Sequence, residues 1–390
     1  MTFDKTILQV IPSLDSGGAE RTTLEMARAI VAAGGQAIVA ASGGRMIADI
    51  ERAGGRVAIL PVASKNPVAM LANAGRLEGI IRKERVDIIH ARSRAPAWSA
   101  LFAARRTGAA FVTTWHGAYS AGDPLKRLYN SAMARADLVI ANSGFTAESI
   151  RRLRDPGGRL TIIHRGADLD EFNLGAVSEA RKASLAAQWG LDAGRGLVLL
   201  LPGRLTDWKG HSVAIEATRL MIASGDYGAR DDFRLIFAGD VQGRDGYAAA
   251  LVRGVEKLGL SQMIRFVGHC DDMPAAYALA DVVLSPSTRP EAFGRVAAEA
   301  GAMARVAIAA DHGGSREIIL DGDTGFLVAP GSAPALAKAI TKAAAMGAGG
   351  RTAIGAKARA RIAQSFSAAA MTSATLDAYR ALLLSRATGA

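Results

Sequence analysis

Residues 281–302 read DVVLSPSTRPEAFGRVAAEAGA, a strand pattern followed by a turn and then a helix pattern. The apolar run at the start predicts a buried strand that ends at Pro286, and we expect a helix to begin near Phe293. Glu291 lies in the turn between them, and Glu299 follows eight residues later. If both acids were helical, they would lie about 12 Å apart along the helix axis, and their side chains would point about 80° apart around it. Carboxylates so far apart cannot act on one atom, so we predict that they contact two ends of one long ligand.

The composition indicates a two-domain α/β protein. The chain has 390 residues, of which 50% are hydrophobic and 43 are glycine. That length exceeds one ordinary core and suits two domains of about 150 to 200 residues. The high apolar content suits buried parallel strands. Because Cys270 is the single cysteine and no Cys/His set has ligand spacing, we expect neither a disulfide framework nor a metal site.

The sequence favours a cytoplasmic location. No uninterrupted apolar run reaches the roughly 18 residues that a membrane span needs. The N-terminus lacks the pattern of a signal peptide. A chain with one cysteine also suits a reducing compartment.

The net charge of +11 has two interpretations. Binding to nucleic acid is not expected, because no recognition helix, zinc finger or aromatic-basic ribonucleoprotein motif is present. Basic, partly amphipathic helices fit an anionic membrane surface. They fit a solvated, arginine-rich surface equally well.

Short apolar strands alternate with helix patterns in two series, as βαβ units require. The strands expected in the first series are 6–14, 36–42, 57–62, 86–93, 109–117 and 136–143, and those in the second are 197–205, 233–240, 263–270, 281–287 and 305–314. The joint is expected between Asn173 and Gly196, where a polar, alanine-rich helix replaces the strand pattern. Two such series predict two doubly wound domains, in which ligands bind beyond the carboxyl ends of the strands.

Two of these strand ends carry groups suited to an anion. Gly17 and Gly18 follow the first strand and precede a helix, where backbone N–H groups can approach a phosphate. The alternative is an ordinary tight turn.

Arg204 and Lys209 follow the first strand of the second series. Arg204 can bind two oxygens and Lys209 adds a compact charge, so the pair could clamp a diphosphate without a metal. The alternative is two solvated surface cations.

The segment PEAFGRVAAE at 290–299 resembles the Glu-x7-Glu motif of retaining glycosyltransferases of family 4. Further segments follow in the matching order, namely GGAER at 17–21, HG at 116–117, RGAD at 165–168, GRL…KG at 203–210 and AGD at 238–240. The resemblance extends from about Thr6 to Tyr379. It implies the GT-B architecture, which is two Rossmann-like doubly wound parallel-sheet domains facing across a cleft.

The same resemblance implies three regions. Residues 1–175 would form the acceptor-binding domain and residues 176–366 the nucleotide-sugar donor-binding domain. Residues 367–390 would form a helix that crosses back to the first domain.

The resemblance also implies roles for single residues. Arg204 and Lys209 would hold the donor diphosphate, and Gly17 and Gly18 would approach the phosphates. Glu291 would contact the donor sugar, beside the backbone of Phe293, Gly294 and Arg295. Glu299 would bind the ribose. His116 resembles the active-site histidine of the family, although a structural histidine after a strand would look the same. RGAD stands where the family often has Asn-Gly-Val-Asp, which leaves the role of Arg165 open.

In such retaining enzymes the β-phosphate oxygen of the leaving group is thought to assist the acceptor. The residues expected to support catalysis are therefore His116, Glu291, Arg204 and Lys209, and none of them needs to be a nucleophile. Glu291 is expected to orient the sugar and stabilise charge in an oxocarbenium-like transition state. No cofactor is expected besides the donor, which would be GDP-mannose or a UDP-sugar.

The acceptor is expected at Arg92, Arg94 and Trp98, within the segment IHARSRAPAWSA at 89–100. These side chains could recognise an anionic glycan or lipid-linked acceptor, or they could belong to an ordinary helix start. Together with TTWHGAYS at 113–120 and VGHCDDMPAAYALADVVLSPS at 267–287, the segment is similar to the lipopolysaccharide-core mannosyltransferase-like branch. That similarity implies transfer of a hexose such as mannose in lipopolysaccharide-core or other cell-envelope polysaccharide synthesis, with peripheral contact at the inner face of the cytoplasmic membrane.

Other functions remain open at this point. An epimerase of the same fold would process a nucleotide sugar without an acceptor glycan. A phosphorylase is disfavoured, because no lysine has a pyridoxal-phosphate context. A non-catalytic nucleotide-sugar-binding protein would be expected to lose some of the residues that this chain retains.

Overall fold

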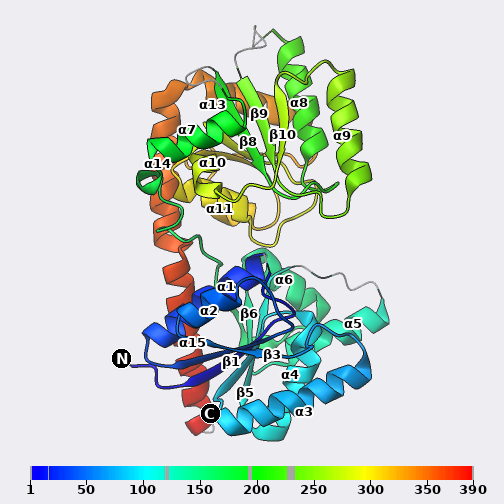
Figure 1. Cartoon of the computed structure of the whole chain (residues 1–390), viewed down its shortest axis with the longest axis vertical. Helices are drawn as coiled ribbons and strands as arrows, with labels where there is room; N and C mark the ends of the chain where they lie inside the picture. The colour runs from blue at the N-terminus through cyan, green and yellow to red at the C-terminus, as the bar shows by residue number, and fades with distance from the viewer. Residues whose placement is uncertain are drawn as a thin grey trace. The chain divides into compact units, whose positions relative to one another are not determined.

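The computed structural model describes residues 2–15, 17–117, 119, 123–191, 196–225 and 233–388. The chain divides into two compact units, each with its own parallel sheet and helices on both faces (Figure 1). Unit 1 comprises Met1–Arg165 and Ala368–Ala390, and unit 2 comprises Gly166–Ser367. The α/β class with two Rossmann-like domains is therefore confirmed.

The strands of unit 1 are β1 (Thr6–Val10), β2 (Gln36–Ala41), β3 (Arg56–Ile59), β4 (Ile88–Ala91), β5 (Ala110–Trp115), β6 (Leu138–Ala141) and β7 (Leu160–Ile162). Its helices are α1 (Gly18–Ala32), α2 (Ile47–Arg52), α3 (Pro67–Glu84), α4 (Arg94–Thr107), α5 (Pro124–Ser131), α6 (Gly144–Leu153) and α15 (Ala368–Thr388), with 3₁₀ turns η1 (Met133–Arg135) and η2 (Gly157–Arg159). The strand order is β3-β2-β1-β4-β5-β6-β7, and all pairs are parallel.

The strands of unit 2 are β8 (Leu197–Pro202), β9 (Phe233–Ala238), β10 (Ile264–Gly268), β11 (Val282–Ser285), β12 (Val306–Ala310) and β13 (Phe326–Val328). Its helices are α7 (Glu179–Gln188), α8 (His211–Ala223), α9 (Asp245–Lys257), α10 (Met273–Leu279), α11 (Arg295–Ala302), α12 (Ser315–Ile318), α13 (Ala333–Ala345) and α14 (Gly347–Ser365), with the 3₁₀ turn η3 (Leu174–Ala176). The strand order is β10-β9-β8-β11-β12-β13, again parallel throughout.

Both sheets reverse their winding at one place, between β1 and β4 in unit 1 and between β8 and β11 in unit 2. Loops that leave adjacent strands on either side of such a point separate, and this leaves a crevice in which ligands of open α/β sheets bind. Candidate site residues should therefore be sought after these four strands and their neighbours.

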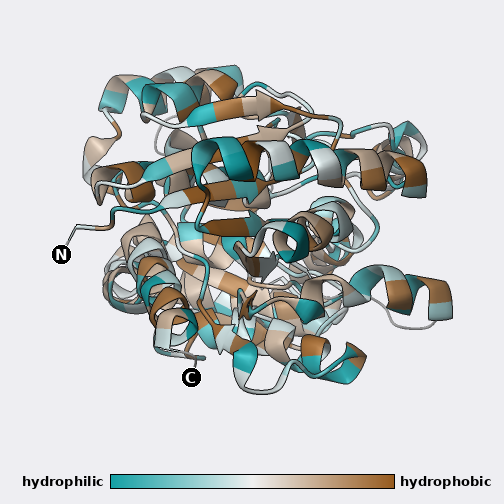
Figure 2. Ribbon diagram, turned by 90° about the horizontal axis from the view of Figure 1, so that it is seen from below, coloured by the Kyte–Doolittle hydropathy of each residue, from teal (hydrophilic) through white to brown (hydrophobic). Residues whose placement is uncertain are grey.

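Alternate residues of each strand face opposite layers of helices. In unit 1, Leu8 and Ile89 pack with Leu101 of α4 on one face, whereas Ile7 packs with Leu376 of α15 on the other. The helices carry hydrophilic and hydrophobic residues side by side, as expected for elements with one buried face (Figure 2).

The boundary between the units differs from the expected position. It falls at Arg165–Gly166, not after residue 175 or within 173–196. The reason is that the following segment packs within unit 2. Phe172 is buried against Tyr277, with ring centroids 5.8 Å apart, and its carbonyl accepts a hydrogen bond from Arg359 at 3.2 Å.

Two strands were not expected from the sequence. They are β7 and β13, each of three residues and each at an edge of its sheet. Such short runs carry too little periodicity to be recognised, and the adjacent strand supplies the register that defines them.

Two leucines of α15 test how this helix is held. Leu376 is 8% exposed in the core of unit 1, whereas Leu384 is 66% exposed on the same helix. We expect Leu376→Ala to lower the free energy of unfolding by about 2 to 4 kcal/mol, because it removes buried methyl groups and leaves a cavity. Leu384→Ala should change it by less than about 0.5 kcal/mol. Urea-induced unfolding measures both, and equal effects would contradict the packing of α15 on this sheet.

Candidate functional site

The loops after β8 and β11 bring two predicted site residues of unit 2 into contact. Lys209 Nζ donates a hydrogen bond to Glu291 Oε1 at 2.8 Å, and the two side chains are only 15% and 10% exposed. Ser287 Oγ donates to the same carboxylate oxygen at 2.6 Å. An ammonium and a carboxylate are thus held together at the point where the sheet reverses its winding.

The charge of Glu291 is fixed by these neighbours. Burial by itself raises the pKa of this carboxyl. The Lys209 ammonium and the hydrogen bonds from Lys209 and Ser287 outweigh burial, and the pKa of Glu291 lies below its ordinary value. Glu291 is therefore an anion at neutral pH, suited to accept hydrogen bonds from hydroxyl groups.

The backbone around Glu291 depends on glycines after β12 and before α8. A Cβ atom on Gly313 would overlap the carbonyl of Glu291, and one on Gly314 would overlap the carbonyl of Phe293. Gly210 lies in the same way against the carbonyl of Pro286. Only glycine lets these loops approach so closely, so these three positions fix the backbone on which Glu291 is carried.

Sequence reasoning missed part of this frame. Residues 311–314 read DHGG and were placed at the end of an expected strand, but β12 stops at Ala310. His312 Nε2 instead contacts the carbonyl oxygen of Ser287 at 2.9 Å. Two adjacent glycines directly after a buried strand were the signal that could have identified the segment.

Helix α11 begins later than expected. It starts at Arg295 and follows Gly294, which adopts the left-handed conformation with φ 93°. The N–H groups of its first turn therefore belong to Arg295 and the residues after it, not to Phe293, whose side chain is buried and 4% exposed. Glu291 lies outside the helix, so the 12 Å estimate from helical rise does not apply to it.

Glu299 is buried on α11 with both carboxylate oxygens in contact. Tyr277 Oη donates to Oε2 at 2.7 Å, and Arg295 Nε lies 2.7 Å from Oε1. Burial and the charge of Glu299 hold the pKa of Tyr277 well above its ordinary value, so the phenol stays protonated as the donor. A carboxylate has about four lone-pair positions, which leaves acceptors for the hydroxyls of a ligand.

Arg204 lies in the same loop as Lys209 but faces solvent. Its Nη1 donates to Gln242 Oε1 at 3.4 Å. An exposed guanidinium with so long a bond can turn toward an incoming anion at little cost.

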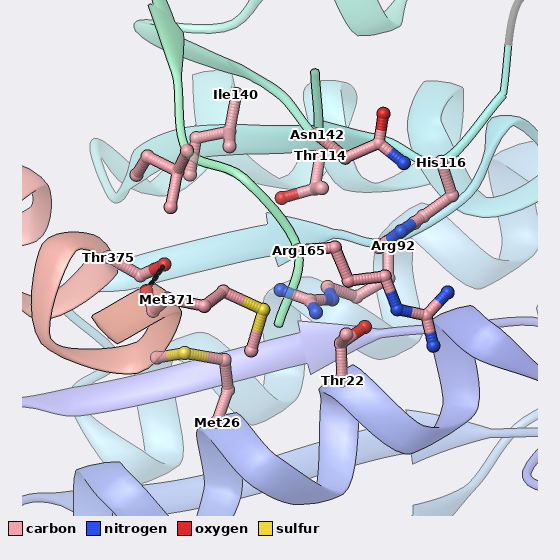
Figure 3. A pocket seen from close by; sticks show the side chains of 11 residues that line it. Thr22, Met26, Arg92, Thr114, His116, Ile140, Asn142, Arg165, Met371 and Thr375 are labelled. Carbon is pink, nitrogen blue, oxygen red and sulfur yellow. Dashed lines mark hydrogen bonds between the residues drawn. The ribbon is translucent and has the colours of Figure 1, made fainter. Parts of the chain in front are cut away.

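A pocket in unit 1 contains other predicted residues (Figure 3). Its lining comes from α1, α15 and the carboxyl ends of β4 to β7, and consists of Thr22, Met26, Arg92, Thr114, His116, Ile140, Asn142, Ile163, Arg165, Met371 and Thr375. Arg92, Asn142 and His116 gather at one end, and Met26 and Met371 lie at the other.

His116 is neutral in this pocket. Burial holds its pKa well below the ordinary value, and the positive charges of Arg92 and Arg165 lower it further. Neither ring nitrogen has a hydrogen-bond partner among the described residues, and the same is true of Arg92 Nε and Asn142 Oδ1. Buried polar atoms without partners mark a place that a polar ligand or water can satisfy.

Arg165, whose role the sequence left open, lies against the start of α1. A Cβ atom on Gly18 would overlap its guanidinium group. Gly18 thus lets α1 begin beside a cation of the pocket, which the sequence did not predict.

The three residues expected to bind the acceptor do not form one group. Arg92 is 3% exposed and lines the pocket. Arg94 instead lies over the ring of Tyr119 at 3.9 Å and donates to Asn130 at 3.3 Å. Trp98 Nε1 donates to the carbonyl of Tyr129 at 3.0 Å. The last two contacts join α4 to α5.

Within the described ranges, no three His, Cys, Asp or Glu side chains are grouped as metal ligands. Across the same residues, no helix combines the length and the apolar character required to span a bilayer.

Two Rossmann-like units with polar loops at the reversal of each sheet define a protein of the GT-B class. Comparison with known proteins agrees. The model described as Glycosyltransferase Family 4 matches residues 16–171, and that described as Glycosyl transferases group 1 matches residues 187–361. The chain belongs to the GT-B glycosyltransferases, with a family 4 N-terminal half.

Individual relatives give the same result. EpsD of Bacillus subtilis (strain 168), named as a glycosyltransferase, is 31% identical over 280 residues, which is 69% of this chain and 70% of EpsD. The crystal structure of a glycosyltransferase from Rickettsia africae ESF-5 is 32% identical with a TM-score of 0.88, covering 97% of this chain and 99% of that chain. HepE of Anabaena in complex with UDP has a TM-score of 0.82 over 97% and 100% of the two chains, but at 23% identity it shows the fold alone.

The ion pair in unit 2 generates a prediction about stability and pH. Lys209→Met leaves Glu291 buried without its cation, and we expect the free energy of unfolding to fall by about 3 kcal/mol at neutral pH. In the wild type, the pKa of Glu291 is lower in the folded protein than in the unfolded chain. The ionised carboxylate therefore stabilises the fold at pH values above the unfolded pKa, and this stabilisation is lost as pH falls through the folded pKa. In the variant burial dominates and raises that pKa, so stability falls as pH rises. The difference in free energy of unfolding between the wild type and Lys209→Met should therefore grow from about pH 4 to 7.

Urea unfolding at several pH values measures this deficit. Lys357→Met is the matched control, because its 2.6 Å pair with Asp323 is 62% and 51% exposed and should matter by less than about 0.5 kcal/mol. Adding Glu291→Gln to Lys209→Met should recover much of the loss. A deficit that does not vary with pH would contradict the assigned charge state.

The buried hydroxyl of Tyr277 gives a prediction about ligand binding. Tyr277→Phe removes one of the two groups that hold Glu299. If Glu299 binds the donor ribose, affinity for a nucleoside diphosphate should fall about ten-fold by calorimetry. Tyr379→Phe is the control, because it removes an equally buried hydroxyl that bonds His90 at 2.6 Å in unit 1. Unchanged affinity in Tyr277→Phe would rule out this role for the contact.

Proposed function

We propose that this glycosyltransferase moves a hexose, such as mannose, from a nucleotide-diphospho-sugar to a glycan or lipid-linked acceptor, with retention of configuration and without a metal ion. The observation that carries the proposal is the Lys209–Glu291 pair at 2.8 Å, on loops after the adjacent strands β8 and β11. One partner suits a phosphate and the other suits sugar hydroxyls, and both lie where donors bind in open α/β sheets.

The cations of unit 2 account for the donor diphosphate. Lys209 is held in place by Glu291, and Arg204 is exposed nearby in the chain and can bind two oxygens. Together they would stabilise the charge that develops on the departing diphosphate. HepE structures of the same fold hold UDP and UDP-glucose, which supports a nucleotide-sugar donor here.

Glu291 would orient the transferred sugar without attacking it. Its oxygen Oε1 is already bonded by Lys209 and Ser287, which makes it a weak nucleophile and a good fixed acceptor. We propose that the leaving β-phosphate assists the acceptor on the same face, with the buried Glu291 anion stabilising positive charge at the sugar. Glu299 would hold the ribose.

In unit 1, the pocket at Arg92 and His116 would take part of the acceptor. A neutral imidazole can accept one hydrogen bond from an acceptor hydroxyl and donate another. Among the relatives, the D-inositol 3-phosphate glycosyltransferase of Geodermatophilus obscurus is 34% identical over 203 residues, half of this chain and 43% of that protein. Its name contains a phosphorylated compound, D-inositol 3-phosphate, which supports an anionic acceptor beside Arg92 here.

The cell-envelope setting is also proposed. WaaG, described as a glycosyltransferase involved in lipopolysaccharide biosynthesis, shares the fold with a TM-score of 0.73 at 19% identity. We propose action on a lipopolysaccharide core or another envelope polysaccharide, at the cytoplasmic face of the inner membrane.

A screen of donors tests the proposal. Purified protein is incubated in EDTA with GDP-mannose, UDP-glucose, UDP-N-acetylglucosamine or ADP-glucose, and the melting temperature and nucleoside diphosphate release are measured. One donor should raise the melting temperature, and Arg204→Ala and Glu299→Ala should each reduce this rise. Arg289→Ala is the matched control, because this exposed arginine pairs with Asp207 at 2.9 Å and has no proposed role.

Each outcome decides between functions. NMR of the glycoside product should show the anomeric configuration of the donor, and inversion would overturn retention. Epimerisation or hydrolysis of UDP-N-acetylglucosamine without an acceptor would favour an epimerase. No response to any donor or nucleoside diphosphate would favour a non-catalytic protein.

A further inference from the structure

His312, in the loop after β12 of unit 2, has one ring nitrogen that the contacts described so far do not explain. The residue is partly exposed, but its Nδ1 atom is buried and has no hydrogen-bond partner among the described residues. Buried polar atoms are nearly always paired in native proteins, so such an atom calls for a ligand group or an ordered water.

The other ring nitrogen fixes the tautomer of His312. Nε2 lies 2.9 Å from the carbonyl oxygen of Ser287. A carbonyl oxygen can only accept a hydrogen bond, so Nε2 carries a proton and donates it. In the neutral ring the lone pair therefore belongs to Nδ1. Nδ1 is thus a hydrogen-bond acceptor that no donor in the described part of the chain uses.

The loop that carries His312 is held against Glu291. The backbone N–H of Gly314 donates to the carbonyl of Glu291 at 2.9 Å, and a Cβ atom on Gly313 would overlap the same carbonyl. Ser287, whose carbonyl accepts from His312, donates through Oγ to Glu291 Oε1 at 2.6 Å. Ser287 therefore connects the imidazole to the carboxylate.

The imidazole also lies within electrostatic reach of this carboxylate. Burial raises the pKa of Glu291, whereas the Lys209 ammonium and, to a smaller degree, His312 lower it. Both hydrogen bonds from Lys209 and Ser287 go to Oε1, which leaves Oε2 for a ligand. The site therefore presents two neighbouring acceptors, Glu291 Oε2 and His312 Nδ1.

Two neighbouring acceptors suit hydroxyl groups better than phosphate. The oxygens of an ionised diphosphate have no proton to donate, and the Glu291 carboxylate would repel them. The hydroxyl groups of a sugar can donate to both atoms. The chemistry of the two acceptors thus matches the sugar part of a nucleotide sugar, not its diphosphate.

We propose that His312 Nδ1 accepts a hydrogen bond from a hydroxyl group of the transferred sugar, and that His312 is thereby a specificity-determining residue of the donor site. The inference rests on the proposed function, because it requires that Glu291 bind the sugar of the donor. A donor sugar without this hydroxyl group is disfavoured, because it leaves the buried acceptor unpaired.

Two substitutions separate the two ring nitrogens. The amide of glutamine reaches the position of Nε2, so His312→Gln can still donate to the carbonyl of Ser287 but has no acceptor at the position of Nδ1. The amide of asparagine reaches the position of Nδ1 and is too short to reach Ser287. His312→Gln should therefore keep the loop in place and lose the sugar contact, and His312→Asn should do the reverse.

Calorimetry on the full chain at about pH 8, where an imidazole is ordinarily neutral, tests the proposal. It measures the affinity for UDP-glucose and for UDP, and for GDP-mannose and for GDP. The ratio of affinities within a pair isolates the contribution of the sugar. For the pair that the wild type binds, His312→Gln should weaken nucleotide-sugar binding about ten-fold and change nucleoside diphosphate binding by less than about two-fold. His312→Asn should keep most of the ratio but have a lower melting temperature than the wild type.

His269→Gln is the matched control, because it makes the same replacement in the same unit. Both ring nitrogens of His269 lie near carboxylates, Nδ1 at 3.3 Å from Asp240 and Nε2 at 3.0 Å from Asp271. The ratio of the two affinities should not change in this variant.

Three results would overturn the proposal. An unchanged ratio in His312→Gln would leave Nδ1 to an ordered water only. An equal loss of affinity for the nucleotide sugar and the nucleoside diphosphate would place the ring at the diphosphate. An equal fall of the ratio in His312→Gln and His312→Asn would show that the ring acts through the position of Ser287 and not through Nδ1.

Failure of this inference is distinguishable from failure of the proposed function. A wild type that binds neither UDP nor GDP would refute the donor site, and the role of His312 with it. A wild type that binds a nucleoside diphosphate, with a ratio that His312→Gln leaves unchanged, would refute the role of His312 alone.

Discussion

The buried contact between Lys209 and Glu291 is the interaction on which the candidate donor site depends. Removing either partner leaves an uncompensated charge in a place that is mostly closed to water. The contact also requires the loops after β8, β11 and β12 to approach more closely than any residue but glycine allows at positions 210, 313 and 314. The geometry of the charged pair is thus maintained by backbone packing rather than by the two side chains alone.

Unit 1 contains a different arrangement of buried polar groups. His90 is satisfied by Tyr379 at 2.6 Å and Thr114 at 2.8 Å, and so connects α15 to the sheet. His116 is also buried, but its ring nitrogens have no partner among the described residues. Burial lowers the pKa of both histidines, so the two residues differ in their contacts and not in their charge.

The sequence located several of these residues without their contacts. Lys209, Glu291 and Glu299 were identified by their place after strands and by the family motif, and Lys209 and Glu291 do meet in space. Ser287, Tyr277 and His312 were missed, because the residue type by itself does not show which distant group each side chain contacts. Arg94 and Trp98 were grouped with Arg92 because they are close in the chain, but helix geometry directs them toward α5.

By itself, the sequence determined the alternating series of strands and helices, and therefore the two parallel sheets and the edges at which site residues lie. It could do so because apolar periodicity and glycines after strands are local properties. The tertiary structure alone decided the boundary at Arg165, the short edge strands β7 and β13, and the start of α11 at Arg295. It also decided which buried polar atoms are paired. These features depend on contacts between residues far apart in the chain, for which no local pattern exists.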